Sequence, residues 1–101
     1  METVKAWAAG IVDGEGHVKV ERYKSSRGIV RVDNTDIKIL RRLQVFFGGS
    51  IYPNFRKDRP KSKPCWFWVI TGKKVVVFLE EIIPYLISKK EQAKTVIDFY
   101  N

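Results

Sequence analysis

The chain has 101 residues, of which 45% are hydrophobic and 30% charged, so it is large enough for one compact domain and too small for two. Nineteen Lys and Arg against eleven Asp and Glu give a net charge of +8, and the 13% of aromatic residues exclude a disordered basic tail. A single cysteine, Cys65, excludes an intramolecular disulfide framework, and a single histidine, His17, argues against a Cys/His zinc site. We expect an intracellular protein with a polyanionic partner and no membrane segment.

The positive charge is concentrated in the middle of the chain. Residues 16–72 hold thirteen basic and four acidic residues, a net charge of +9, whereas the two ends together hold six basic and seven acidic residues. The surface that binds a polyanion is therefore predicted to come from this middle segment.

Two stripes of side chains run along a first helix, predicted around residues 4–13. The apolar stripe, typical of a core-facing surface, consists of Val4, Trp7, Ala8 and Ile11. The second stripe, on the opposite side, consists of Ala6, Ala9, Gly10 and Asp13. Gly10 and Gly14 have the spacing that lets two helix backbones approach closely, so this stripe predicts pairing between two copies of the chain. Tolerance of glycine near a helix end is the simpler alternative.

Two carboxylates at the end of this helix lie where the helix dipole disfavours negative charge. Asp13 and Glu15 each cost about 0.3–1 kcal/mol there unless a positive group compensates. A nearby lysine would do so, and so would a hard divalent cation, which prefers carboxylate and carbonyl oxygens. Pairing of two such helices would bring two copies of Glu15 close to one axis and favour the cation further.

The middle of the chain alternates between strand and helix patterns. Residues 17–24 and 29–33 alternate polar and apolar side chains and predict a hairpin with one wet face, turned by Ser25, Ser26 and Gly28.

A helix follows this hairpin. Either Asn34 or Thr35 can cap it, and Gly48 with Gly49 can end it. Residues 50–56 and 65–71 predict a second hairpin. The chain is then helical from Lys73, with a break or kink at Pro84 before a last helix.

Residues 8–16, with the sequence AAGIVDGEG, resemble the nine-residue motif that names the LAGLIDADG homing endonucleases. The likeness continues through residues 34–36, 40–52, 84–87 and 89–93, so it covers nearly the whole chain. It implies an α+β fold of the αββαββα type over residues 1–101, with a saddle-shaped antiparallel sheet and helices on one face. It also implies a homodimer joined by the motif helices that cleaves both strands of double-stranded DNA with divalent metal and leaves 3′ overhangs. Because such a dimer presents the same surface twice, the site should be a near-palindrome.

The resemblance also assigns the chemistry to particular residues. It implies that Mg²⁺ or Mn²⁺ binds at Glu15, beside the carbonyl of Gly14; glutamate stands here where the family name has aspartate. It implies that Lys89 lies near the scissile phosphate and that Asn34 orders water, with Lys38 one helical turn on. Hydrolysis of a phosphodiester needs an activated water and neutralised phosphate charge, which this set can supply. Helix capping by Asn34 and a solvated Lys89 are the plainer alternatives.

DNA recognition would use the solvent-facing sides of the strands and the basic loop between the two strands of the second hairpin. We expect direct contacts from His17, Lys19, Glu21, Tyr23, Arg31, Asp33, Lys38, Tyr52 and Asn54, and phosphate contacts from Arg56, Lys57, Arg59, Lys61 and Lys63. Trp66 and Trp68 share one side of their strand and Phe67 and Val69 the other. We expect the tryptophans to touch DNA, although alternation alone leaves the choice open.

Two other functions fit the same surface. An RNA-binding splicing factor, an activity some family members have acquired, would not need Glu15, and neither would a DNA-binding module without cleavage. The presence of both Glu15 and Lys89 favours the endonuclease. We expect the protein in the cytoplasm of a prokaryotic or phage-infected host, or in an organelle.

Overall fold

The computed structural model describes residues 2–23, 25–54 and 64–101. In chain order it contains α1 (Glu2–Glu15), β1 (Gly16–Tyr23), β2 (Ser25–Asn34), α2 (Ile37–Phe47), β3 (Ser50–Asn54), β4 (Cys65–Thr71), α3 (Lys73–Ile82), the 3₁₀ helix η1 (Ile83–Tyr85) and α4 (Lys90–Phe99). The predicted succession of elements is confirmed, including the break at Pro84, which lies in η1. Among the described residues no helix has the length and apolarity needed to cross a lipid bilayer.

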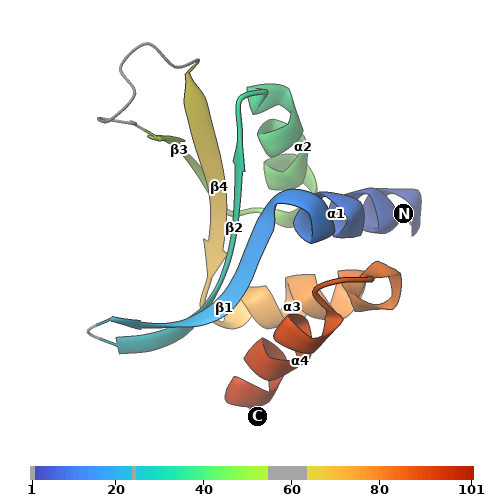
Figure 1. Cartoon of the computed structure of the whole chain (residues 1–101), viewed down its shortest axis with the longest axis vertical. Coiled ribbons are helices and arrows are strands. Elements are labelled where there is room, and N and C mark those ends of the chain that lie inside the picture. The colour runs from blue at the N-terminus through green and yellow to red at the C-terminus, as the bar shows by residue number, and fades with distance from the viewer. Residues whose placement is uncertain (1, 24, 55–63) are drawn as a thin grey trace.

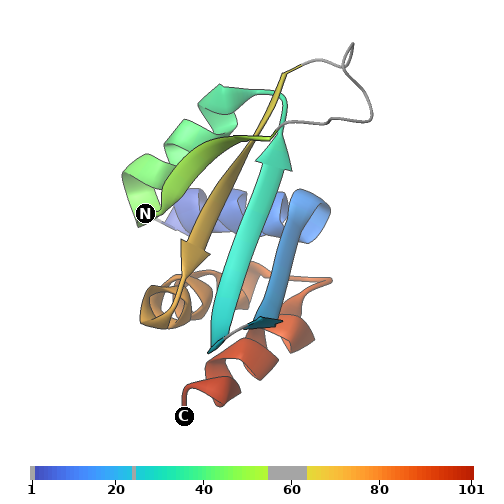
Figure 2. The same ribbon diagram turned by 90° about the vertical axis from the view of Figure 1, so that its left-hand side faces the viewer.

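The four strands form one antiparallel sheet in the order β1–β2–β4–β3. The two hairpins therefore meet in the middle of the sheet, where β2 pairs with β4. Figure 1 shows that all of the helices lie on one side of this sheet. Figure 2 shows the opposite side, an open face that no helix covers. The predicted α+β architecture is thus confirmed.

The hydrophobic core lies between the sheet and the helices, and Trp68 of β4 is its largest fully buried side chain. Its ring contacts that of Phe78 with 5.4 Å between centroids, and its indole N–H donates to the Gly48 carbonyl at 2.7 Å. The prediction that Trp66 and Trp68 contact DNA is therefore wrong. Both side chains point to the helix-covered side of β4, where Trp68 is fully buried and Trp66 packs against the same core.

Two glycines end α2, as predicted. Gly48 and Gly49 have φ values of +80° and +88°, a region that other residues rarely adopt. At Gly49 a β-carbon would also lie 2.7 Å from Nε1 of Trp68 and 2.8 Å from the Val69 carbonyl. The glycine thus lets the chain pass over the central tryptophan before β3 begins.

The start of α2 differs from the prediction. Asp36 caps the helix by accepting a hydrogen bond from the Lys38 amide at 3.0 Å, so neither Asn34 nor Thr35 is the cap. The side-chain oxygen of Asn34 accepts instead from the amide of Asp36 at 2.8 Å. The side-chain oxygen of Asn34 therefore bonds to the cap residue itself and not to an amide of the first helical turn.

The first hairpin is also longer than predicted. Ser25, Ser26 and Gly28 are members of β2 rather than turn residues, because β2 stays paired with β1 as far as Tyr23 opposite Ser25. Pairing of β2 with β4 begins only at Ile29. The far end of the hairpin therefore extends beyond the rest of the sheet as a two-stranded ribbon.

The apolar stripe of α1 packs on the core as predicted, and the helix also buries Ala9 and Val12, which the stripe does not include. Its buried residues are Val4, Ala8, Ala9 and Val12. Ala9, predicted at a dimer interface, is fully buried within its own chain, so that prediction is wrong. The small side chains of Ala8 and Ala9 let the helix pack closely on the core. The larger Trp7 and Ile11 stay at its partly exposed rim.

Candidate active site and nucleic-acid interface

Glu15 and Asn34 meet at the junction of α1 with the sheet. Glu15 is the last residue of α1, and Asn34 is the last residue of β2. The Asn34 side-chain amide donates to Oε2 of Glu15 at 2.6 Å, while its oxygen is held by the Asp36 amide. Two residues that are 19 positions apart are thereby joined, and the exposed Glu15 carboxylate is held in one orientation.

Asp13 and Lys89 form a second set of contacts beside this pair. The Asp13 carboxylate accepts hydrogen bonds from the backbone amides of Ile87, Ser88 and Lys89 at 2.7–3.0 Å. In return, Nζ of Lys89 donates to the Asp13 carbonyl at 2.8 Å. The lysine thus supplies the positive charge that the C-terminal end of α1 requires. The Asp13 carboxylate is thus used within the chain, and its place at a dimer interface stays a prediction.

One chain offers a divalent cation only part of a coordination shell. Glu15 contributes an exposed carboxylate, and Gly14 belongs to the last helical turn, whose carbonyls lack intrahelical partners. Within residues 2–23, 25–54 and 64–101 there is no group of three or more His, Cys, Asp and Glu side chains that could hold a metal. The donor chemistry suits Mg²⁺, which takes one or two carboxylates and keeps several waters.

The open face of the sheet carries a polar hollow along β1 and β2, on the side that Figure 2 turns toward the viewer. Its lining consists of His17, Lys19, Glu21, Ile29, Arg31 and Asp33. These residues share one face because they alternate along the strands and pair as His17 with Arg31 and Lys19 with Ile29. The surface offers hydrogen-bond donors, acceptors and an apolar group together, the mixture that reading of base edges requires.

Arg31 and Asp33 are not free on this surface, because they form a bidentate pair at 2.8 and 3.0 Å. Asn54 of β3 donates to the same carboxylate at 2.7 Å, and the Arg31 guanidinium lies 3.9 Å from the ring centroid of Phe67. The hydrogen bond from Arg31 lowers the pKa of Asp33, and the same bond raises that of Arg31. Three strands thus hold one preorganised cluster of donors and acceptors.

Phe67 is the aromatic residue on the open face that the sequence-based assignment missed. It pairs with Asp33 of β2 on one side and with Tyr52 of β3 on the other. The Tyr52 ring lies 5.5 Å from that of Phe67, and Tyr52 is 49% exposed. The pairing of Phe67 with Asp33 of β2 places Phe67 on the open face. Alternation within β4 alone does not decide whether this face carries Phe67 or the two tryptophans.

The remaining predicted contacts lie outside this cluster. Lys38 is exposed in the first turn of α2. The loop residues Arg56, Lys57, Arg59, Lys61 and Lys63 and the side chain of Tyr23 lie outside the described residues.

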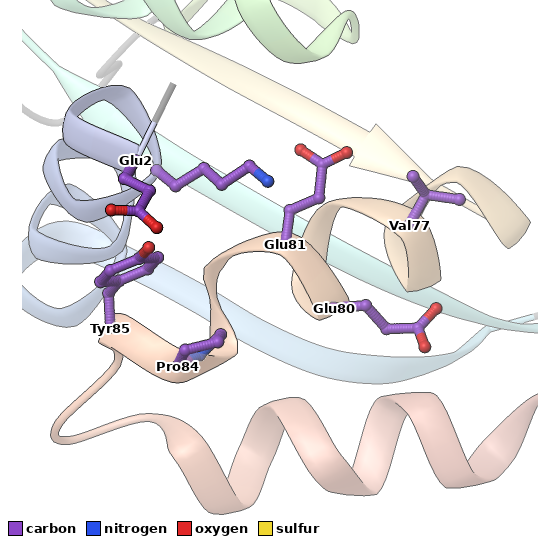
Figure 3. Close-up of a pocket in the computed structure, with 7 residues that line it drawn as sticks. Glu2, Val77, Glu80, Glu81, Pro84 and Tyr85 are labelled. Atoms are coloured by element: carbon purple, nitrogen blue, oxygen red, sulfur yellow. The ribbon is translucent and has the colours of Figure 1, made fainter.

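A separate pocket on the helix side of the sheet is net negative, whereas the charges of the hollow balance, with Lys19 and Arg31 against Glu21 and Asp33. Figure 3 shows it between α1 and the segment from α3 to η1, with Glu2, Glu80 and Glu81 among its lining residues. The three carboxylates outnumber the one lysine of this pocket, Lys5, so the pocket disfavours a polyanion. The open face, not this pocket, is therefore the candidate nucleic-acid interface.

Comparison with known proteins identifies the family to which this fold and site belong. The family model described as a LAGLIDADG-like domain matches residues 2–83. The chain is similar to the homing endonuclease I-CvuI in complex with its target, with 26% identity and a TM-score of 0.78 over 96% of this chain and 65% of that chain. No protein among the curated sequences matches.

Two further solved structures share the fold at lower identity. The archaeal intron-encoded homing endonuclease I-Vdi141I, complexed with DNA, has 14% identity and a TM-score of 0.77 over 96% of this chain and 66% of that chain. The meganuclease I-SmaMI, bound to uncleavable DNA, has 20% identity and a TM-score of 0.68 over 93% of this chain and 35% of that chain. The chain thus spans just under two thirds of the length of I-CvuI and I-Vdi141I. Because the family model covers most of its residues, the chain belongs to the LAGLIDADG family, whose fold it shares with homing endonucleases.

Proposed function

We propose that the protein is a site-specific endonuclease for double-stranded DNA. In this proposal it acts as a homodimer on a near-palindromic site, uses Mg²⁺ or Mn²⁺, and leaves 3′ overhangs. The observation that carries the proposal lies at the end of α1, beside an open polar sheet face. There Asn34 holds the Glu15 carboxylate, and Lys89 donates to the carbonyl of Asp13, two residues before Glu15. Binding alone would need the sheet face but not Glu15, Asn34 and Lys89. The solved relatives I-CvuI and I-Vdi141I are homing endonucleases in complex with DNA, which supports the same function.

Each residue of this set has a distinct task in phosphodiester hydrolysis. Glu15 and the Gly14 carbonyl would hold the cation, which supplies water activation and neutralises charge on the phosphate. Asn34 holds the Glu15 carboxylate through its 2.6 Å hydrogen bond. Lys89 has three N–H donors and gives one to the Asp13 carbonyl. Its ammonium group can therefore stabilise the negative charge that develops on the scissile phosphate.

The homodimer is supported by the exposed side of α1. This small-residue stripe, defined as Thr3, Ala6, Gly10 and Gly14, is exposed along the whole helix. Small side chains at this spacing let two helices pack with their backbones close together. An isologous contact along the stripe would bring the two Glu15 carboxylates toward one axis and complete the oxygen shell that one chain leaves unfinished.

The length of the open face fits a long recognition site. β2 has ten residues, and at about 3.3 Å per residue it is matched by roughly ten base pairs of DNA at 3.4 Å each. Two such faces in a dimer would follow on the order of 15 to 22 base pairs.

The proposal is tested with a supercoiled plasmid library incubated with the protein and Mg²⁺. We expect linear product from the wild type and none from Glu15→Gln, while both bind DNA equally. Glu91→Gln, on the exposed surface of α4, is the matched control and should cut like the wild type. Binding and cutting need separate assays, because the I-CvuI complex with the I-CreI target in the presence of Mg held uncleaved DNA.

Two outcomes would replace the proposal. Equal DNA binding by all three proteins with no cutting under Mg²⁺ or Mn²⁺ would leave a DNA-binding module. Tight binding of intron RNA with weak binding of duplex DNA would indicate a splicing factor.

A further inference from the structure

We infer that Tyr100 is a positioning residue that fixes the outer end of the DNA-reading surface by fastening α4 to the β1–β2 ribbon. The hold of α4 on the ribbon is argued from the geometry around Gly28. Its effect on DNA reading rests on the proposed function. Neither α4 nor Tyr100 is part of the stretch that the family model matches, which ends at residue 83.

The ribbon lacks support from the sheet at this point. The last pair between β2 and β4 is Ile29 with Thr71, whereas β1 and β2 remain paired out to Tyr23 and Ser25. A two-stranded hairpin is only marginally stable by itself in water. The ribbon therefore gains from support by another element, and Figures 1 and 2 show α4 beside the place where the ribbon leaves the sheet.

Gly28 is the residue at which α4 holds the ribbon. Its carbonyl accepts from the Gly72 amide at 3.1 Å, the last backbone bond toward the β4 side. Its own amide donates to the Tyr100 hydroxyl at 2.7 Å, across 72 positions of sequence. A backbone N–H that lies beyond the end of β4 is thus satisfied by a side chain from the end of the chain.

The contact also requires a glycine in the ribbon. A β-carbon at Gly28 would lie 2.7 Å from Cγ1 of Val96 and 2.9 Å from Cε2 of Tyr100. Val96 is fully buried, so it cannot easily move aside. Helix α4 therefore packs directly on the backbone of Gly28, at a distance that a residue with a β-carbon would not allow. This contact sets the angle of the ribbon relative to the helix.

The held segment lies far from the candidate active site. Glu15 precedes the first residue of β1, and the ribbon ends eight residues later, about 26 Å along the strand. Glu21 and Arg27, which form a partly exposed ion pair at 3.7 Å, lie opposite each other in this outer part. The residues that Tyr100 positions would therefore meet the base pairs at the outer ends of the site, not those at its centre.

The first test is amide hydrogen exchange of the free protein, which needs no DNA. Tyr100→Phe removes only the hydroxyl. We expect exchange at Gly28 and along the outer ribbon to be faster by about three- to tenfold, as for the loss of one net hydrogen bond. Tyr85→Phe makes the same chemical change at the pocket of Figure 3 and should leave the ribbon unchanged. Unchanged exchange at Gly28 in Tyr100→Phe would overturn the inference.

The second test is selection of bound sequences from a randomised duplex library. Wild type and Tyr85→Phe should select one consensus, and Tyr100→Phe should keep its central positions and lose preference at its outer positions. An unchanged consensus together with faster exchange would refute the role in specificity. If the wild type selects no sequence, the proposed function fails, while the exchange result still decides whether Tyr100 holds the ribbon. Gly28→Ala, which inserts the excluded β-carbon, should reproduce the Tyr100→Phe consensus.

Discussion

Asp13 shows how a single carboxylate can organise the candidate active site without acting on the substrate. It accepts three backbone amides from residues 87–89 and thereby fixes the segment that carries Lys89. A carboxylate that receives several amide donors is held firmly, because each bond is charge-assisted. Placement errors near 1 Å at a reacting centre can lower rates about a hundredfold. The position of Lys89 is therefore expected to depend on Asp13.

Asp13→Asn tests this dependence. The amide keeps one acceptor oxygen but turns an N–H₂ group toward backbone N–H donors, so the 87–89 segment should loosen. We expect the single-turnover cleavage rate to fall by roughly ten- to a hundredfold while DNA affinity stays near that of the wild type. Asp98→Asn, exposed on α4, is the matched control and should retain the wild-type rate. A parallel loss of affinity and rate would mean that Asp13 merely supports the fold.

Asp33 gives a prediction on the pH dependence of stability. Its hydrogen bond from Arg31 lowers its pKa in the folded protein below the ordinary value of 3.8. A lowered folded pKa means that the unfolded state binds protons more readily, so the pair stabilises the fold above that value. This stabilisation should fade as the pH falls below about 4 and through the folded pKa. In urea unfolding, the stability gap between wild type and Asp33→Asn should be largest near neutral pH and narrow toward pH 2. A gap that is constant with pH would show that the pair contributes nothing through its charge.

At the level of elements, the order of helices and strands could be predicted from the sequence. Which side of β4 faces the helices could not be predicted. Alternation in β4 places Trp66 with Trp68 and Phe67 with Val69 without saying which pair meets the helices. Only the neighbouring strands decide, because Phe67 lies between Asp33 and Tyr52 on the open face. Pairing registers between distant strands are tertiary information, and a pattern within one strand does not contain them.

Helix α1 illustrates a related limit. The stripe predicted from hydrophobicity does pack on the core, but the helix also buries Ala9, which the prediction placed on the opposite side. Small side chains bury less area themselves but let the helix approach the core, and this gain depends on neighbours that lie far away in sequence. By contrast, the helix dipole predicts a compensating positive group at the end of α1, and Lys89 lies there. The hydrogen bond between Asn34 and Glu15 is not part of that prediction, because it joins residues 19 positions apart.

The whole molecule has two faces with different tasks, and the proposed dimer uses a third. The open sheet face carries the polar cluster, and the helix side holds the core and the acidic pocket of Figure 3. The edge formed by α1 carries the small-residue stripe and ends at Glu15. A dimer joined along this edge would place the two open sheet faces side by side, so that dimerisation and alignment of the two active sites would depend on one contact.

Gly10→Glu separates the stability of the chain from the assembly of the dimer. A β-carbon at Gly10 meets nothing within 4 Å, so the substitution should not disturb the single chain. Replacing glycine within a helix stabilises it by up to about 1 kcal/mol, so the thermal midpoint of the monomer should stay level or rise. Close packing of two helices would, however, be blocked by the larger charged side chain. We expect sedimentation at micromolar concentration to show a monomer, with plasmid cleavage lost. Val45→Glu, which adds the same charge at a position that is 79% exposed on α2, should remain dimeric and active. If Gly10→Glu sediments and cuts like the wild type, or if the wild type is a monomer both free and on DNA, the two chains do not meet along this stripe.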